Sequence, residues 1–283
     1  MKQSDIDILI LLQNNSPNDD FCGLTPNQVH DLMYNTFSPD SPLKLNAGIP
    51  DEILNEIPFY RLTEEFLKII QRDGAIKLTP LGALPKKLLQ ELYEHKFILE
   101  RVIESGISKL SREIDSPVLT SLHINTVLSK AVKKVNGNLT LTKLGKDSLH
   151  PGKRNELFRI TLLTFTLKFN WSYNDWYPEK PIIQSGWAFT LFLLLRFGEQ
   201  SREIKFYSDT FLQAFPAIRP ALIDRPFGTQ DEYLASWYYV QAIHRFAEWF
   251  GFIKYESQPD ILQSWGTKIQ RTDLLTRIFS LLP

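Results

Sequence analysis

One nine-residue pattern occurs twice in this chain and sets most of its expected architecture. Residues Gly74–Gly82 read Gly-Ala-Ile-Lys-Leu-Thr-Pro-Leu-Gly, and residues Gly137–Gly145 read Gly-Asn-Leu-Thr-Leu-Thr-Lys-Leu-Gly. A weaker third copy starts at Gly251–Tyr255 and resumes at Lys268–Leu274. In each copy an apolar helical stretch ends at glycine, which tolerates the left-handed backbone of a helix C-terminus. A short alternating strand follows, and Thr-x-Leu begins the next helix.

The order helix, glycine, strand and hairpin is typical of a winged-helix-like unit, in which a helix packs on a small sheet. Three candidate units lie around residues 60–95, 120–150 and 232–282. A competing interpretation is that the pattern is a generic exit from helix to strand, with several short strands packed within one helical domain. We therefore expect a mainly α (α+β) fold, multi-helical with winged-helix-like units and short β-hairpins.

The 283 residues are enough for one large domain or two to three small ones, with a sizeable buried core. Residues 1–115 are expected to form an N-terminal helical region with the first winged-helix-like unit. Residues 116–283 are expected to hold the second and third units and a buried helical hairpin. The hairpin consists of residues 156–169 and 186–197, which are apolar nearly all round and therefore typical of buried helices.

Capping residues predict where other helices begin. Thr25-Pro26 combines an N-cap with a proline at the first helical position, which predicts a helix to Tyr34. Thr63 and Thr120 are the expected caps of the next two long helices, over 63–73 and 121–135. The other expected elements are helices over 5–14, 84–110, 201–223, 232–250 and 274–282, and a β-hairpin of residues 252–255 and 267–272 through the loop at Pro259-Asp260.

Charge is balanced over the whole chain but not along it. Lys plus Arg and Asp plus Glu are both 32, so the net charge is zero, which argues against a dedicated high-affinity nucleic-acid binder. Residues 1–85 carry 6 basic and 12 acidic side chains, whereas residues 86–170 carry 15 basic and 8 acidic ones. The basic middle third either binds a polyanion or pairs with the acidic first third inside one globule.

Two groups of side chains are candidate binding residues. The basic group is Lys130, Lys133, Lys134, Lys143, Lys146, Lys153 and Arg154. Lys130, Lys133 and Lys134 are spaced to share one face of the helix expected over 121–135. In a winged-helix unit such a helix and its wing would contact phosphates of DNA or RNA. The alternative interpretation is a solvated lysine-rich face.

The second group is aromatic and lies in a polar loop between two apolar helices. Its members are Trp171, Tyr173, Trp176 and Tyr177. Exposed rings can stack on bases, peptides or small ligands. Alternatively, the loop folds back and covers the apolar helices. The aromatic helix over 232–250 is interpreted as core or as a dimer face.

No catalytic or metal-binding pattern is evident. The five histidines are scattered, no nucleophile-elbow, P-loop, dinucleotide or HExxH motif occurs, and neither a cofactor nor a catalytic residue is expected. Cys22 is the only cysteine, which excludes an intrachain disulfide and fits a reducing compartment. The longest apolar run, Gly186–Leu195, is shorter than the ~20 residues of a membrane span, and the acidic N-terminus is unlike a signal peptide. A cytoplasmic protein without membrane contact is therefore expected.

Part of the chain resembles a known but uncharacterised family. Gly23–His30, followed by Lys77-Leu78-Thr79-Pro80-Leu81-Gly82-Ala83-Leu84-Pro85, is similar to a bacterial module with the signature Lys-Leu-Thr-x-x-Gly-x-Leu-Pro. This module is found alone or beside domains similar to the plasmid pRiA4b ORF-3 group. The resemblance covers about residues 20–95 and implies a bacterial, cytoplasmic protein, with no activity or site residues to transfer.

These observations favour a non-enzymatic protein that associates with nucleic acid or acts in regulation through the basic segment 130–154. The alternative hypothesis is a protein-interaction scaffold or homodimer that uses aromatic surfaces near Trp171–Tyr177 or Trp237–Phe250. An enzyme with an unfamiliar site is a third hypothesis, which a deep pocket with convergent polar groups would favour.

Overall fold

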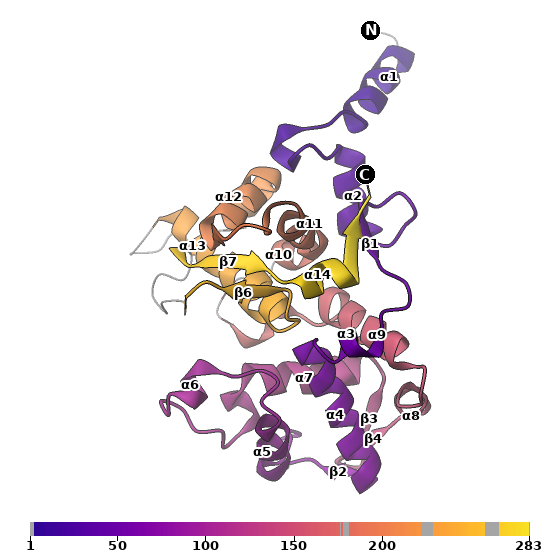
Figure 1. Ribbon diagram of the computed structural model, residues 1–283, viewed down its shortest axis with the longest axis vertical. Coiled ribbons are helices and arrows are strands. Elements are labelled where there is room, and N and C mark those ends of the chain that lie inside the picture. Colours follow the sequence, from indigo (N-terminus) through magenta and orange to yellow (C-terminus); the bar gives the residue numbers. More distant parts are fainter. Residues whose placement is uncertain (1–2, 176, 178–180, 222–228, 258–265, 283) are drawn as a thin grey trace. The chain divides into compact units, whose positions relative to one another are not determined.

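The chain forms two compact units. The computed structural model describes residues 3–175, 177, 181–221, 229–257 and 266–282 (Figure 1). Unit 1 contains Met1–Ala47, Trp176–Glu248 and Phe252–Pro283, and unit 2 contains Gly48–Asp175 and Trp249–Gly251. Both are mainly helical with small antiparallel sheets, which confirms the predicted mainly α fold with short β-hairpins.

Unit 2 holds a three-stranded antiparallel sheet in the order β2-β4-β3. Its elements are α3 (Asp51–Leu54), α4 (Pro58–Asp73), β2 (Ile76–Lys77), α5 (Lys86–Glu94), α6 (Arg101–Glu104), the 3₁₀ turn η2 (Glu113–Asp115), α7 (Pro117–Leu128), β3 (Val132–Val135), β4 (Asn138–Leu141), α8 (Lys143–Ser148), α9 (Arg154–Leu167) and the 3₁₀ turn η3 (Trp171–Asn174). In the register, Ile76 lies opposite Leu139 and Lys77 opposite Asn138. The first and second copies of the sequence pattern therefore build one sheet together, and the domain boundary expected between residues 115 and 116 falls inside this unit.

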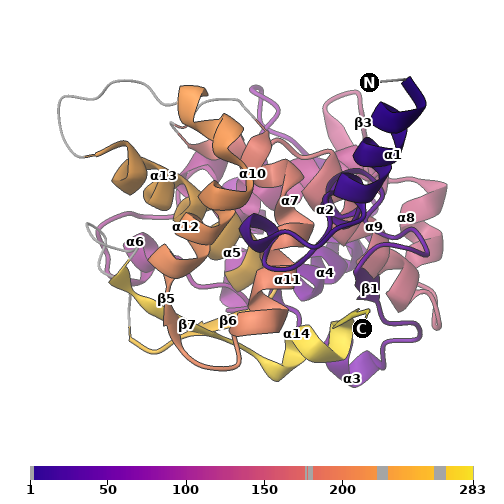
Figure 2. The same ribbon diagram turned by 90° about the horizontal axis from the view of Figure 1, so that it is seen from above.

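Unit 1 holds a second three-stranded antiparallel sheet, in the order β5-β7-β6 (Figure 2). Its elements are α1 (Gln3–Asn14), η1 (Asp19–Phe21), α2 (Pro26–Tyr34), β1 (Leu43–Leu45), α10 (Ile182–Ser185), α11 (Trp187–Phe197), β5 (Arg202–Glu203), α12 (Ile204–Ala214), η4 (Pro216–Ala221), α13 (Gln230–Tyr238), the π-helical segment η5 (Tyr239–Glu248), β6 (Ile253–Tyr255), β7 (Lys268–Arg271), α14 (Asp273–Ile278) and β8 (Phe279–Leu281). A separate two-stranded pair joins β1 and β8.

The two units repeat one connectivity. Unit 2 runs α4-β2-α5-α7-β3-β4, and unit 1 runs α11-β5-α12-α13-β6-β7. In both, the last strand of the hairpin lies in the middle of the sheet, and a threonine at the N-cap, Thr142 or Thr272, precedes the next helix. The three predicted copies are thus parts of two units. The third strand of the sheet in unit 1 is β5, which lies within the stretch expected to be helical over 201–223.

Aromatic side chains fill both interiors. In unit 2, Phe59 of α4 lies 5.0 Å from Phe165 of α9 and 5.4 Å from Phe250 between ring centroids. In unit 1, residues 187–194 of α11 are buried throughout. The two helices expected as one buried hairpin, α9 and α11, therefore belong to the cores of different units.

Several predicted helix limits are wrong for local reasons. Thr63 lies inside α4, where its hydroxyl donates to the Phe59 carbonyl at 2.9 Å, and the helix starts at Pro58. Ser116 rather than Thr120 caps α7, since its hydroxyl oxygen accepts from the Leu119 amide at 3.1 Å. The helix expected over 84–110 ends at Glu94, and Lys96 has φ +55°.

Other expectations are confirmed. The helix over 26–34 begins with a complete capping box between Thr25 and Gln28, and α1 occupies the first expected helix. Strands β6 and β7 pair antiparallel as expected. The loop at Pro259-Asp260 lies outside the described residues.

Candidate nucleic-acid and protein interfaces

The basic helix face expected at residues 130–134 does not exist. Helix α7 ends at Leu128, Lys130 has φ +63°, and Lys133 and Lys134 lie on β3. Asn136 and Gly137 connect β3 to β4 with φ values of +50° and +75°, which suits the two-residue turn of a β-hairpin. Because neighbouring side chains of a strand point to opposite faces, Lys133 and Lys134 diverge. The sequence feature that indicates this hairpin is Asn136-Gly137, which the helix predicted over 121–135 placed just after its end.

The hairpin and α8 nevertheless bring five lysines into one region of unit 2. These are Lys130, Lys133, Lys134, Lys143 and Lys146, all exposed. The Thr142 hydroxyl donates to the Lys130 carbonyl at 2.7 Å, which fixes the start of α8 beside the start of β3. Gly145 permits this approach, because a Cβ there would lie 2.1 Å from the Ala131 carbonyl oxygen.

Sheet register distributes the lysines over the hairpin. Lys133 lies opposite Thr140, on the same face as Lys77 and Asn138 of the neighbouring strands. Lys134 lies on the other face, and its ammonium group reaches the turn at Gly82, 2.6 Å from the position of a Cβ there. Among the described residues, none of the five lysines has an acidic partner within ion-pair distance. These cations are therefore available to an anionic ligand.

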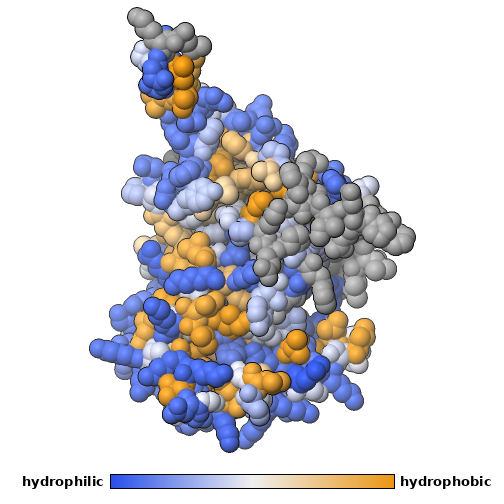
Figure 3. All heavy atoms as spheres, turned by 180° about the vertical axis from the view of Figure 1, so that it is seen from behind, coloured by the Kyte–Doolittle hydropathy of each residue, from blue (hydrophilic) through white to orange (hydrophobic). Residues whose placement is uncertain are grey.

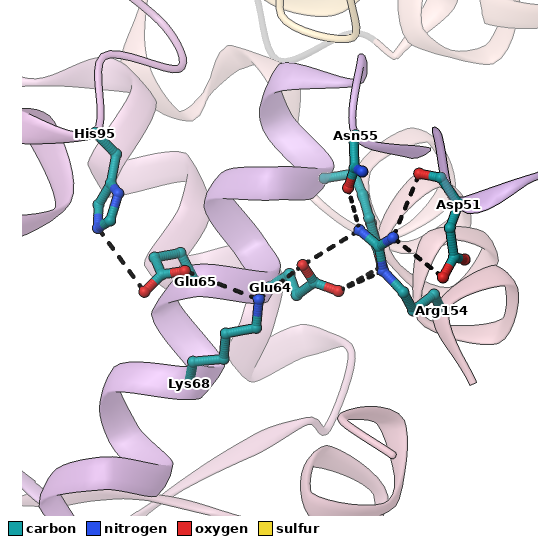
Figure 4. Close-up of polar contacts among 8 residues, drawn as sticks. Asp51, Asn55, Glu64, Glu65, Lys68, His95 and Arg154 are labelled. Atoms are coloured by element: carbon teal, nitrogen blue, oxygen red, sulfur yellow. Dashed lines mark hydrogen bonds and ion pairs between the residues drawn. The ribbon is translucent and has the colours of Figure 1, made fainter. Parts of the chain in front are cut away.

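Lys153 and Arg154, the remaining two candidates, are paired with carboxylates inside unit 2. Lys153 Nζ lies 2.9 Å from Glu156 Oε2. Arg154 at the start of α9 donates to Glu64 Oε1 at 2.8 Å and to Asn55 Oδ1 at 2.7 Å, and lies 3.5 Å from Asp51 Oδ2 (Figure 4). This network joins α3, α4 and α9, so Arg154 is structural.

The electrostatics of the network favour its ionised form. Only 18% of the Arg154 side chain and 13% of the Glu64 side chain are exposed. Burial by itself raises the pKa of the Glu64 carboxyl, but hydrogen bonds from Arg154 and Lys68 outweigh it and hold this pKa below its ordinary value. Burial and the neighbouring Glu64 carboxylate raise the pKa of the Tyr60 hydroxyl, which donates to Glu64 Oε1 at 3.0 Å.

The aromatic candidates do not form one exposed platform. Trp171 is buried in unit 2, where its Nε1–H donates to the Phe165 carbonyl at 2.8 Å. Tyr173 is 62% exposed. Tyr177 belongs to unit 1 and stacks on Trp237 with ring centroids 5.9 Å apart. Trp176 lies outside the described residues. The expectation of a shared ligand or partner surface on this loop is therefore not supported.

The second expected aromatic surface, Trp237–Phe250, is interior. Trp237, Ile243 and Phe246 are buried within unit 1, and Trp249 and Phe250 are buried in unit 2. The helical segment α13–η5 is thus core rather than an exposed dimer face.

Helix α7, the third helix in the connectivity of unit 2, is buried over most of its length, and its exposed end is Val127-Leu128. Helix α7 has no Lys or Arg, and Val118, Leu119 and Leu122 are among its buried residues. The Glu113 carboxylate also approaches it, with Oε1 2.9 Å from His123 Nδ1, while Oε2 accepts from the Leu84 amide. This buried pair fixes η2 to α7, and it was not identified from the sequence.

A hollow of about 520 Å³ lies beside β2, and the charged side chains that line it are Arg72, Asp73, Glu91, Lys77 and Lys87. Arg72 contacts Asp73 at 2.7 Å and Glu91 at 2.6 Å. The Arg72 hydrogen bond lowers the pKa of the Asp73 carboxyl. The two carboxylates that line the hollow are therefore already paired with Arg72.

Metal sites and membrane-spanning helices are two further features to consider within the described residues. No group of three or more His, Cys, Asp or Glu side chains there could hold a metal ion. Within the same residues, no helix is both long and apolar enough to cross a bilayer. Burial raises the pKa of the Cys22 thiol, and the positive charge of Arg196 partly offsets this rise.

Comparison of the chain with protein-family models, curated proteins and solved structures found no match.

Proposed function

We propose that the chain is a non-enzymatic, nucleic-acid-associated or regulatory protein built from two winged-helix-like units in tandem. Support comes from the connectivity shared by both units, with one helix, a strand, two helices and a hairpin whose last strand is central. This is the order of a winged helix, in which the hairpin is the wing. In this proposal β3–β4 is the wing of unit 2 and β6–β7 the wing of unit 1.

The observation that carries the proposed binding surface is a group of five lysines without ion-pair partners among the described residues. They lie on β3, on α8 and, for Lys130, two residues before β3. Clustered lysines bind nucleic acid mainly by neutralising phosphates and releasing counterions. We refer to Lys130, Lys133, Lys134, Lys143 and Lys146 as the hairpin lysines.

The proposed mode is contact with the nucleic-acid backbone rather than reading of bases. In helix-turn-helix proteins the second helix of the motif enters the major groove and carries the base contacts. The corresponding helix α7 is mostly buried and has no Lys or Arg. Contacts made by the hairpin lysines to phosphates carry little sequence information. A bacterial, cytoplasmic setting completes the proposal, supported by the resemblance at Lys77–Pro85 and by the single cysteine, Cys22.

A charge-reversal pair tests this function by fluorescence anisotropy with a labelled DNA duplex at low salt. Lys133→Glu/Lys134→Glu should weaken binding at least tenfold, and two unrelated duplex sequences should bind wild type equally. The matched control, Lys254→Glu/Lys268→Glu, places the same change on the hairpin of unit 1 and should alter affinity much less. No binding by wild type, or equal loss in both variants, would contradict the proposal.

A second candidate function, self-association, is favoured by a different observation. Helix α1 has no buried residue, although half of it is apolar. This helix replaces the aromatic surfaces as the feature that supports an interaction protein.

A further inference from the structure

Helix α1 presents a large apolar surface to solvent. Six Ile and Leu side chains of this helix are between 37% and 63% exposed, namely Ile6, Ile8, Leu9, Ile10, Leu11 and Leu12. Figure 3 shows apolar atoms exposed along the helix, at the top of that view. In Figure 1 the helix points away from α2, its neighbour in unit 1. We propose that α1 of one copy docks on the lysine-bearing hairpin surface of a second copy of this chain.

Helix α1 requires a partner to be stable. It has twelve residues, and isolated helices of this length are marginal in water. The run Ile8–Leu12 is apolar on every side, a pattern that belongs to helices enclosed by other protein. A contact that covers only one side of α1 would leave part of this run in water.

The hairpin surface of unit 2 offers complementary apolar contacts. Val127 and Leu128 precede β3. Val135 ends β3 on the face of Lys133, and Leu81 lies in the turn that Lys134 reaches from the opposite face, so apolar side chains flank both faces of this edge strand. The four side chains are between 37% and 97% exposed. Strand β3 is an edge strand of about 13 Å, and the apolar part of α1, Ile6–Leu12, is about 10 Å long. The two surfaces therefore match in character and in length.

Charge selects this pairing over others. The only charged side chains of α1 are Asp5 and Asp7, in its first half, whereas the hairpin surface carries the five hairpin lysines. An anionic membrane is a poor partner, because interfacial helices of membrane-bound proteins are rich in Lys and Arg. Two α1 helices packed on each other would bring together only acidic charges. The hairpin surface of a second copy combines basic and apolar side chains, so it complements both the charge and the apolar residues of α1.

Self-association through this contact would cover the lysines assigned to nucleic acid. The inference does not depend on nucleic-acid binding, since the apolar side chains of α1 take no part in that function. The two proposals therefore fail in different experiments.

The test is the mass of the full chain by sedimentation equilibrium over a wide concentration series. Wild type should associate, and Leu9→Ser/Leu12→Ser should weaken association by roughly a hundredfold, the effect of losing two leucines from an interface. Neither leucine is buried, so the variant should keep its fold, and its DNA affinity should not fall. Monomeric wild type at every concentration, or unchanged association of the leucine variant, would overturn the inference.

A charge exchange identifies the docking surface. Lys133→Glu/Lys134→Glu should weaken association, and adding Asp5→Lys/Asp7→Lys to that variant should restore it, whereas Lys254→Glu/Lys268→Glu should leave it unchanged. Association that persists through the reversal, or that the exchange fails to restore, would place α1 on another partner and overturn the inference. A wild-type chain that stays monomeric but binds anionic vesicles through α1 would also overturn the inference.

Discussion

At the scale of single residues, the clearest constraint in the molecule is the pairing of Arg154 with Glu64. Both side chains are mostly buried, and the guanidinium also contacts Asn55 and Asp51. Removing one partner of such a pair costs more than the pair contributes, because a buried charge is left uncompensated. The sequence indicated that Arg154 is basic but could not show its partner, since Glu64 lies on a helix 90 residues earlier.

Arg154→Met should lower the free energy of unfolding by about 3 kcal/mol, since it leaves the Glu64 carboxylate buried without its main partner. Urea denaturation followed by circular dichroism measures this change. Lys153→Met is the matched control, because Lys153 pairs with Glu156 in solvent, and it should leave the unfolding midpoint unchanged. Equal effects of the two substitutions would contradict the structural role of Arg154.

The pH dependence follows from the sign of the Glu64 shift. Its pKa is lower in the folded than in the unfolded chain, where a Glu has a pKa of about 4.3. The pair therefore stabilises the fold above that unfolded value, and this stability is lost as pH falls through the folded pKa. The stability gap between wild type and Glu64→Gln, from urea midpoints at several pH values, should be constant near neutrality and shrink below about pH 4. If the stability difference between wild type and Glu64→Gln grew as the pH fell, it would contradict a lowered pKa of Glu64 in the folded chain.

At the scale of elements, the sequence identified the cap of α2 but not those of α4 and α7, and it failed where a strand resembles a helix. Thr25-Pro26 starts α2 as expected because capping depends on residues within one turn. Val132-Lys133-Lys134-Val135 continues the apolar spacing of α7, so it was assigned to that helix, although Asn136-Gly137 marks a hairpin. Strands β5 and β8 could not be found, because they are only two and three residues long and pair with distant segments.

Gly145 provides a test of how α8 is fixed to the hairpin. Gly145→Ala would place a methyl group 2.1 Å from the Ala131 carbonyl oxygen, and it should lower the free energy of unfolding by about 2 kcal/mol through overpacking. Thermal denaturation measures the change. At Gly266 an alanine methyl group meets no atom of the described residues within 4 Å, so Gly266→Ala should be neutral. Tolerance of alanine at residue 145 would contradict the close approach of α8 to β3.

At the scale of the whole molecule, the sequence contained the repeat but not its grouping. Each copy was interpreted as one unit, because the sequence of a strand does not show which other strand it pairs with. Pairing of β2 with β4, across about 60 residues, merges two copies into one sheet. The expected binding residues separate for a similar reason, since Arg154 and Trp171 contact partners inside unit 2 that the sequence does not identify. The hairpin lysines and Tyr173 stay exposed.

Unit 2 should depend on a segment far along the chain. Phe250 lies 5.4 Å from Phe59 and 5.3 Å from Phe165 between ring centroids, so Phe250→Ala should destabilise unit 2 by about 4 kcal/mol. Hydrogen exchange should accelerate in α4 and α9 more than in α11 and α12. Tyr173→Ala, which removes an exposed ring of the same unit, should change little. Faster exchange confined to α11 and α12 would contradict this assignment of Phe250.

The most direct test of the central claim is the salt dependence of DNA binding. If the five hairpin lysines neutralise five phosphates, the logarithm of the association constant should fall against the logarithm of salt concentration with a slope of about −4.5. Lys133→Glu/Lys134→Glu should make this slope shallower by about 2, and Lys254→Glu/Lys268→Glu should not change it. Binding that is insensitive to salt, or a slope that the hairpin reversal leaves unaltered, would contradict nucleic-acid binding by this surface.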